Sequence, residues 1–336
     1  MNLRPTLATL TSSARSLLLA LGTALGFAFV LKALLLIVSG EFGLDTPGVI
    51  VRGFLHPGLA VFGGGLLAAL AIELVLTGWA ASSLRRLLIA PSDSARSDLF
   101  YLFLALSGGI AASATLISAG LVDAAVALLD ARSHHGPLVD APIWMAAPLL
   151  YLGMTFFNYW NHRLLHTRAL WRLHAVHHSA TEFTIGTAAR ISPMEAVLIA
   201  VPQAIPAALL GASPDAILIA SMVASFESLW THSNLRGLGW LERIGISSPR
   251  AHKIHHARDA RFHDHNFGDL VLIWDRLFGT YMDSRNAPAD LVLGVDGMGD
   301  RYDSRQPLRD FLQVHVDWVR DLITRVRPRP LPATTS

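Results

Sequence analysis

The 336-residue sequence contains no cysteine, which excludes disulfide frameworks, iron–sulfur clusters, thiolate metal sites and cysteine nucleophiles. Charge is also scarce: charged residues make up 15% of the chain, against roughly 25% in a typical soluble domain. Lysine occurs only at Lys32 and Lys253, and the sequence has no dense basic stripe, so we expect no nucleic-acid partner. Because apolar residues make up 52% of the chain, the composition indicates a membrane protein. Any metal in it needs nitrogen or oxygen ligands.

Long apolar runs predict several membrane-spanning helices. Crossing the ~30 Å hydrocarbon core as a helix takes roughly 20 apolar residues. The runs that reach this length are Leu17–Val38, Leu59–Trp79, Leu99–Leu129 and Ala141–Trp160. Prolines and a glycine interrupt a further run, Ala196–Leu229, near its middle, which predicts two shorter helices that meet at a turn. The sequence therefore predicts an all-α, polytopic membrane helical bundle.

The placement of arginine predicts the orientation of these helices, because arginine in short loops favours the cytoplasm. Arg15 precedes the first run, and Arg85 and Arg96 follow the second, so both flanks are expected on the cytoplasmic side. When the spans are counted along the chain, every histidine cluster falls on the cytoplasmic side. We expect the clusters to form a histidine-rich helical cap there. We expect an integral, multi-pass protein of a bacterial cytoplasmic membrane.

Two further features lie outside these runs or interrupt them. Glu73 lies within the second run, where a charge indicates either a functional site or a side chain that is protonated or packed against another helix. From Leu308 to Val326, apolar residues recur at helical spacing between charged ones, which predicts an amphipathic surface or packing helix. The proline-rich tail 327–336 is expected to be disordered.

Eight of the fifteen histidines fall in three short clusters. Their spacings are H-x-x-x-H once and H-x-x-H-H twice, and a ninth histidine lies just after the run Ala196–Leu229. Helical residues three and four apart share a face, so each cluster directs its imidazoles to one side. Imidazole binds iron, copper, zinc and nickel, and nine imidazoles exceed the four ligands of one tetrahedral site, which favours two metals. The predicted ligands are His162, His166, His174, His177, His178, His232, His252, His255 and His256.

Other metal-site classes fit the sequence less well. A zinc protease needs glutamate after its first histidine in H-E-x-x-H, and Arg163 follows His162 here. A soluble-type di-iron site needs Glu-x-x-His pairs, which the chain lacks. A haem bound by two histidines would need them inside facing spans, whereas these clusters lie beyond the span ends. The segment Leu55–Gly58 is only loosely similar to a cytochrome b5 haem loop, and we interpret it as a turn.

Short strings around the histidines form a recurring pattern. They are Tyr159–His166, Leu170–Ser179, Arg190–Glu195, His232–Asn234, Pro249–His256, Asn266–Gly268 and Trp274–Tyr281. Together they resemble the fatty acid hydroxylase/sterol desaturase superfamily of membrane di-iron enzymes, over about residues 150–283. The resemblance does not extend to residues 1–140.

The resemblance implies an O2-dependent enzyme that hydroxylates a lipid, either a fatty acyl chain, a sterol or a related molecule. It implies two irons per chain, bound by the eight clustered histidines with His232 as a ninth ligand. The expected organisation is a transmembrane region of about three spans over residues 1–140, a di-iron catalytic domain with a membrane hairpin over 141–285, and an amphipathic helix and tail over 286–336. No nucleotide-binding glycine loop is present, so an external electron donor is implied: a reductase, a ferredoxin or a cytochrome b5-like protein.

The sequence departs from the superfamily pattern at two positions. Ser192 and Ser228 stand where many relatives have histidine, and His263 or His265 could compensate for a lost ligand. Carboxylates in the same region are candidates to orient the imidazoles through their second ring nitrogen. These candidates are Asp259, Asp264 and Asp269.

Two alternatives to hydroxylation stay open at this point. The same ligands can support desaturation or ether-lipid cleavage. A metal-binding membrane protein or transporter would instead distribute histidines through its spans, which these clusters avoid. The sequence does not indicate an oligomeric state.

Overall fold

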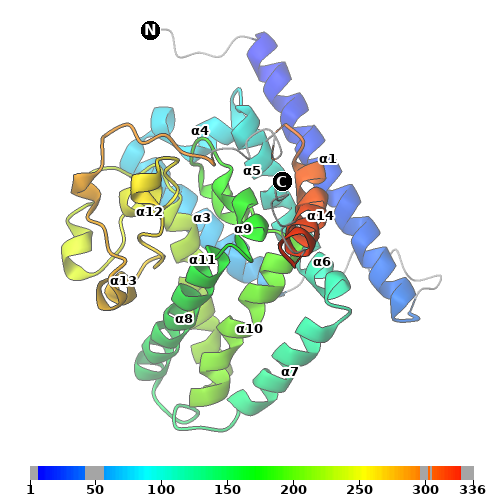
Figure 1. Cartoon of the computed structure of the whole chain (residues 1–336), viewed down its shortest axis with the longest axis vertical. Helices are drawn as coiled ribbons and strands as arrows, with labels where there is room; N and C mark the ends of the chain where they lie inside the picture. The colour runs from blue at the N-terminus through cyan, green and yellow to red at the C-terminus, as the bar shows by residue number, and fades with distance from the viewer. Residues whose placement is uncertain (1–6, 42–56, 296–301, 303–304, 327–336) are drawn as a thin grey trace, which may run out of the picture.

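The computed structural model describes residues 7–41, 57–295, 302 and 305–326. Within these residues the chain is helical and forms no strand, only the isolated bridges Ile246–Val271 and Ala257–Leu293. The long helix α1 (Leu7–Val38) runs along one side of the molecule (Figure 1). It packs against α5 (Asp93–Leu106) and α6 (Gly109–Ile117). The predicted tail 327–336 lies outside the described residues, as do Leu55 and His56 of the segment that we interpret as a turn, while Pro57 and Gly58 of that segment begin α3.

A bundle of long helices lies beside α1. Helix α11 packs between α3 and α8, and α10 packs between α7 and α8. The predicted pair of shorter helices joined by a turn is confirmed, because α10 ends before Gly211, whose φ of 65° suits glycine at a tight turn, and α11 follows. The bounds of these helices are α3 Pro57–Thr77, α7 Leu121–Ser133, α8 Ile143–Leu165, α10 Pro193–Leu210 and α11 Pro214–Thr231.

The prediction of one continuous helix over Leu99–Leu129 is wrong. The chain breaks first at Gly108, with φ of 72°, where α5 and α6 meet at a 75° bend. It breaks again at Ala119 and Gly120, with φ of 50° and 78°, before α7 begins. A residue in the left-handed conformation cannot continue a right-handed helix. The length and apolar composition of the run therefore did not predict where its helices end.

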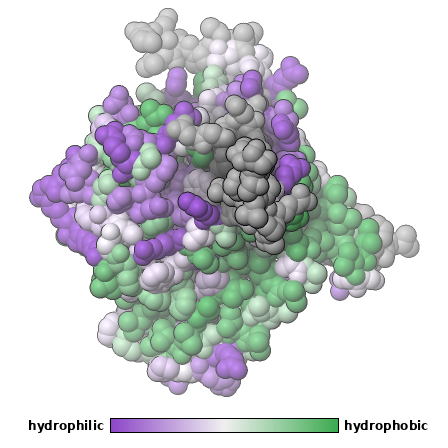
Figure 2. Space-filling model, in the orientation of Figure 1, coloured by the Kyte–Doolittle hydropathy of each residue, from purple (hydrophilic) through white to green (hydrophobic). Residues whose placement is uncertain are grey.

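The apolar surface of the molecule indicates a membrane environment. Two described helices are long and apolar enough to cross a bilayer, at Thr9–Val38 and Pro193–Leu210, and the bent pair α5–α6 would be a third. Val75 is 81% exposed and Trp144 is 76% exposed, which a water-soluble surface rarely tolerates in continuous patches. Figure 2 shows apolar residues gathered over the lower part of the molecule and over the far end of α1. The predicted all-α membrane bundle is confirmed, whereas crossings by α3 and α8 stay predictions.

Short helices cover one end of the bundle and carry most of the clustered histidines. They lie at the polar, upper left side and centre of Figure 1, away from the apolar surface (Figure 2). The α-helices here are α4 Ser83–Leu88, α9 Trp171–His178, α12 Pro249–His255 and α13 Ile273–Phe278. The 3₁₀ helices are η1 Trp79–Ala81, η2 Ile185–Ala189, η3 Leu241–Ile244, η4 Ala260–Phe262 and η5 Ser284–Asn286.

The predicted C-terminal amphipathic helix is present as α14 (Pro307–Val326). It packs against α5 and α9, and its Phe311 and Val314 are fully buried. The indole of Trp318 donates a 2.8 Å hydrogen bond to the carbonyl oxygen of Ala169, in the turn that leads into α9. The C-terminal helix therefore fastens the histidine-bearing end of the molecule to α1 and α5.

Candidate metal centre

All nine predicted histidines converge in two adjacent groups. In each group every residue offers one ring nitrogen, and these nitrogens lie within 4.8 Å of one another. The first group is His162, His166, His174, His178 and His255. The second group is His177, His232, His252 and His256.

The two groups do not follow the sequence clusters. In α9, His174 and His178 lie four residues apart and belong to the first group, whereas His177 belongs to the second. At the end of α12 the assignment is reversed: His252 and His256 belong to the second group and His255 belongs to the first. Each H-x-x-H-H motif therefore contributes to both groups, because its two residue spacings point in different directions around a helix.

Hydrogen bonds fix several rings through Nδ1. The Nδ1 of His162 donates to the carbonyl of Phe267 at 2.8 Å, and that of His232 to the carbonyl of Ser228 at 2.7 Å. The Nδ1 of His255 likewise bonds the carbonyl of His265 at 2.9 Å. A neutral imidazole that donates from Nδ1 keeps a lone pair on Nε2, which is the form that binds a metal.

The histidine ring nitrogens that face the inside of the two groups are better placed to bind a metal ion than to hydrogen-bond one another. The Nε2 atoms of His162 and His174 are 3.1 Å apart, and the Nε2 atoms of His232 and His252 are also 3.1 Å apart. The buried Nε2 atoms of His166, His178 and His255 have no hydrogen-bond partner among the described residues. A buried unsatisfied polar atom costs about 1–3 kcal/mol, so several in one place call for a shared partner such as a metal ion.

The electrostatics of the site keep these imidazoles neutral. Removal from water lowers the pKa of His166 to about 3 and that of His232 to about 3. Burial, reinforced by the neighbouring histidines, also holds the pKa of His178 and His256 well below the usual 6.5. The rings are therefore uncharged at neutral pH and available as ligands.

Glu195 orients a histidine of the first group, a role that sequence analysis did not assign to it. Its Oε1 accepts a 2.7 Å hydrogen bond from the Nδ1 of His174, and both side chains are buried. Glu195 also forms a capping box with Ser192 at the start of α10, which places the carboxylate at that position. The Ser-x-x-Glu spacing was the available signal, and it explains why serine stands at position 192.

Replacing Glu195 by alanine is expected to lower metal affinity about 10–100-fold, because groups that orient ligands contribute on that scale. The matched control is Ser192→Ala, which removes the other half of the capping box. That control is expected to lower the free energy of unfolding by about 1 kcal/mol and leave metal affinity unchanged. Competition with a chromophoric chelator measures the affinity. Equal affinity losses in both variants would mean that Glu195 acts only as a helix cap.

The loop after α12 supplies another orienting group. Asp275 accepts hydrogen bonds from the backbone N–H groups of Phe267 and Gly268, both at 2.8 Å, and from the Thr280 hydroxyl at 2.7 Å. These bonds fix the Phe267 carbonyl that holds His162. The conformation of this loop therefore sets the direction of a candidate ligand.

The carboxylates proposed from sequence are placed differently. Asp259 is engaged by Arg261, at 2.6 Å, on the surface. Asp269 is half-buried and accepts a 2.7 Å hydrogen bond from Asn158. The Asp264 side chain is 74% exposed, and its carboxylate lies 3.6 Å from the Nδ1 of His166. Of these three aspartates, Asp264 alone has a described contact with a histidine of the two groups.

The two extra histidines lie outside both groups. His263 is exposed, and its ring bonds the carbonyl of Arg258 at 3.2 Å. The ring of His265 bonds the carbonyl of His263 at 2.7 Å, and only the backbone of His265 reaches a candidate ligand, His255. Neither imidazole occupies the place of a lost ligand among the described residues.

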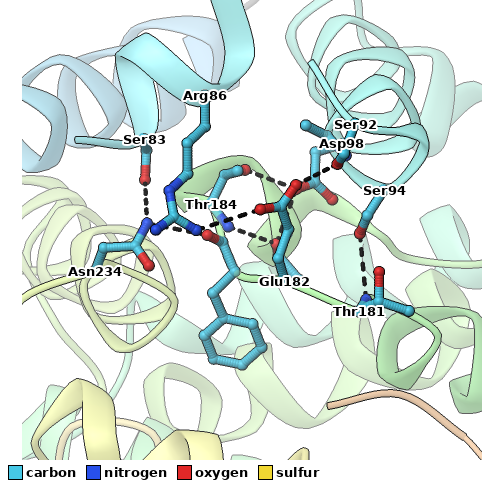
Figure 3. A network of polar contacts seen from close by, with 12 residues as sticks. Ser83, Arg86, Ser92, Ser94, Asp98, Thr181, Glu182, Thr184 and Asn234 are labelled. Atoms are coloured by element: carbon cyan, nitrogen blue, oxygen red, sulfur yellow. Dashed lines mark hydrogen bonds and ion pairs between the residues drawn. The ribbon is translucent and has the colours of Figure 1, made fainter. Parts of the chain in front are cut away.

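The N-terminal part of the chain holds the second group in place. The buried Glu73 carboxylate accepts hydrogen bonds from Ser83 N at 2.6 Å, Ser83 Oγ at 2.9 Å and Asn234 N at 2.6 Å. The Asn234 side chain donates to the Ser83 hydroxyl at 3.3 Å (Figure 3). It also donates to the Phe183 carbonyl at 3.0 Å, and the Phe183 ring packs 5.0 Å from the His232 ring. These contacts favour the packed interpretation of Glu73.

A second buried network secures the segment that follows α9. Arg190 and Asp98 are fully buried and form a 2.6 Å ion pair. Asp98 also accepts hydrogen bonds from the hydroxyls of Thr184, at 2.6 Å, and Thr187, at 3.0 Å, and Arg190 donates to the carbonyl of Ser94 at 2.6 Å. Figure 3 shows Asp98 and Ser94 on α5 facing the 181–184 segment. Helix α5 therefore fixes the chain between α9 and α10.

Two cavities approach the histidines from different sides. A cavity of about 850 Å³ with mostly apolar walls lies within the bundle, and Asn158, Ser228 and Asp269 lie among its polar residues. Ser228 and Asn158 are each one helical turn from a candidate ligand. A smaller cavity of about 370 Å³ is lined by three histidines of the first group together with Arg168 and Arg172.

Comparison with known proteins agrees with this site. Residues 147–280 match the fatty acid hydroxylase family model. Alkylglycerol monooxygenase of Homo sapiens is 31% identical over 152 residues, which cover 42% of this chain and 31% of that protein. Ornithine lipid hydroxylase OlsE of Rhizobium tropici is 31% identical over 195 residues, covering 56% and 58% of the two chains. Alkylglycerol monooxygenase of Danio rerio is 34% identical over 142 residues, covering 40% and 30%.

Residues 147–280 are similar to the fatty acid hydroxylase family, and the resemblance found in the sequence is confirmed. The chain spans less than two thirds of the length of each of these relatives. No solved structure matches the chain significantly.

Proposed function

We propose that this protein is a membrane-bound di-iron oxygenase that hydroxylates a lipid with O2 and externally supplied electrons. The observation that carries the proposal is the pair of histidine groups, with unpaired nitrogens directed at one another. The family match favours iron over redox-inert zinc, because oxygen activation needs a redox-active metal. The nine histidines of the two groups are the proposed ligands, and residues 141–285 are the proposed catalytic domain.

The chemistry that bound iron would supply is reduction of O2 by two electrons from a donor, with one oxygen atom inserted into a C–H bond and the other released as water. The residues of the chain hold this site in a fixed geometry. Glu195 and the Phe267 carbonyl orient ligands, and the rings of Phe183 and Phe267 pack against the histidines and exclude water. Because the imidazole ligands are neutral, the bound metal ions would carry the net charge of the site.

The cavity within the bundle is the proposed place for the lipid chain. Its walls are mainly alanine, isoleucine and other apolar residues contributed by the bundle helices, which suits an acyl or alkyl chain. Burial raises the pKa of Asp269 to about 6, and this residue and Asn158 could bind a polar group of the substrate. The smaller cavity lined by His166, His178 and His255 would admit protons and electrons from outside the bundle.

The topology predicted from the sequence belongs to this proposal. The protein would cross a bacterial cytoplasmic membrane several times, with the histidine-bearing helices on the cytoplasmic side. An electron donor would then reach the site from the cytoplasm, as a separate reductase, ferredoxin or cytochrome b5-like protein.

Ether-lipid cleavage is the second candidate reaction, because several of the relatives are named alkylglycerol monooxygenases. Hydroxylation of the carbon beside an ether oxygen gives a hemiacetal that collapses to an aldehyde and an alcohol. The same site can therefore carry out both reactions.

Oxygen-isotope labelling tests the proposal. Membranes that contain the protein, a reductase system and candidate lipids are incubated under ¹⁸O2, and the lipid extract is analysed by mass spectrometry. The expected result is a lipid alcohol that carries the heavy oxygen, or, in the case of ether cleavage, an aldehyde that is reduced to its alcohol at once, before its oxygen exchanges with water. A chelator-stripped preparation is the control. A lipid alcohol formed by hydroxylation whose oxygen derives only from water, or oxidation that persists in the stripped preparation, would contradict the proposal.

A further inference from the structure

A groove remote from the histidines lies between the first part of α1, the start of α5 and the start of α14. Its volume is about 960 Å³. One part of its lining is apolar and includes Leu19, Phe100 and Leu312. The other part is strongly basic. None of the residues that line it belongs to either histidine group.

The basic part of the groove gathers four arginines from segments far apart in the sequence. They are Arg15, Arg96, Arg305 and Arg309. No acidic side chain is among the described residues that line the groove. Among the described residues, Asp93 lies just outside the groove, pairs with Arg96 at 2.9 Å and lies 3.9 Å from Arg305, so the four arginines outnumber the described carboxylates beside them.

The groove also spans the boundary between head groups and hydrocarbon. Its lining on α1 extends from Ser12 to Thr23, a rise of about 16 Å along the helix. Arg15 directly precedes the apolar run of α1 that begins at Leu17, so the basic part lies at the interface and the apolar part below it. Arginine pairs well with phosphate in such a position, because its planar guanidinium can donate two parallel hydrogen bonds.

The exposed face of α14 continues the apolar part of the groove. Leu312, Val316, Val319 and Ile323 are spaced at helical intervals and are 46–52% exposed, while the opposite face of the helix is buried against the protein. A helix of this kind lies with its apolar face against lipid.

We propose that this groove binds one anionic phospholipid of the surrounding bilayer. The arginines contact its phosphate, and the first part of its acyl chains lies against the exposed side chains of Leu19, Leu312 and Val316. The bound lipid joins α14 to α1, and through the Trp318 bond to Ala169 it steadies the turn that leads into α9. The site is separate from the proposed substrate cavity.

Native mass spectrometry of the iron-loaded full chain in neutral detergent tests the proposal. Dioleoyl phosphatidylglycerol and dioleoyl phosphatidylcholine are titrated separately. We expect one tightly bound phosphatidylglycerol and much weaker phosphatidylcholine. The double variant Arg15→Gln/Arg309→Gln is expected to bind phosphatidylglycerol about 30-fold more weakly, from the usual contribution of each arginine near anionic lipid.

The matched control is Arg132→Gln/Arg261→Gln, which removes the same charge at exposed positions outside the groove. It is expected to bind phosphatidylglycerol like the unmodified chain, and equal iron content in all proteins verifies that the variants fold. Equal affinity for the two lipids, or equal losses in both double variants, would overturn the proposal. Displacement of the lipid by millimolar inorganic phosphate, or a groove covered by a second copy of the chain in lipid-free dimers, would also overturn it.

Discussion

Replacing His255 or His256 by alanine is expected to remove a different iron in each case, although the two residues are adjacent in the sequence. His255 belongs to the first histidine group and His256 to the second. Each single variant should retain about one iron per chain, and the double variant should retain none. Lipid hydroxylation should fall at least about 100-fold in each variant, because even residues that only orient ligands contribute 10–100-fold.

Elemental analysis of the purified variants measures the iron, and the oxygen-labelling assay measures activity. The matched controls are His263→Ala and His265→Ala, in the loop that follows these ligands. The backbone carbonyl of His265 that bonds His255 remains in the second of these. Loss of all iron from both single variants would contradict two separately held metals, and iron loss in the controls would contradict the assignment of ligands.

Replacing Asp98 by alanine is expected to lower the free energy of unfolding by about 3–5 kcal/mol, the usual effect of leaving a buried charge without its partner. Asp98 and Arg190 are both fully buried, and Asp98 also holds the hydroxyls of Thr184 and Thr187. The loss should also loosen the segment between α9 and α10, and metal affinity should fall with it. Chemical denaturation of the detergent-solubilised protein measures the change.

The control for this prediction lies on the same helix. Asp93→Ala removes an ion pair with Arg96 in which both side chains are about half exposed, and it should cost less than about 1 kcal/mol. The double variant Asp98→Ala/Arg190→Met, which removes both buried charges, should recover part of the lost stability. A loss for Asp98→Ala no larger than that for Asp93→Ala would mean that the buried ion pair does not support this part of the fold.

The sequence predicted the histidines because their spacing is local. Residues three and four apart on a helix share a face wherever the helix lies, so convergence within each cluster needs no knowledge of the tertiary structure. The spacing also separates the i+3 histidine of each H-x-x-H-H motif, His177 or His255, from the other two. Which group each histidine joins depends on how α9 and α12 face each other across the site.

The orienting groups were harder to predict because they act over long sequence distances. Asp259 and Asp264 were chosen for closeness in sequence to the last cluster, whereas the carboxylate that bonds His174 is Glu195. Glu73, Ser83 and Asp98 belong to residues 1–140, for which the sequence predicted mainly membrane spans, and of these three it singled out Glu73 alone. Their role follows from tertiary contacts with the segments that carry the histidines.

The break in the run Leu99–Leu129 illustrates a different limit. Apolar composition measures compatibility with lipid, and it does not register the left-handed residues Gly108 and Gly120 that divide the run into three helices. Glycine is tolerated inside helices often enough that its presence alone does not predict a break.

Metal content of the unmodified protein tests the central claim most directly. The protein is purified aerobically from iron-replete cells, and iron and zinc are counted per chain by elemental analysis. The proposed centre predicts about two irons per chain and no stoichiometric zinc. Stoichiometric zinc without iron would contradict a di-iron oxygenase, because zinc cannot carry out the reduction of O2 that the reaction requires.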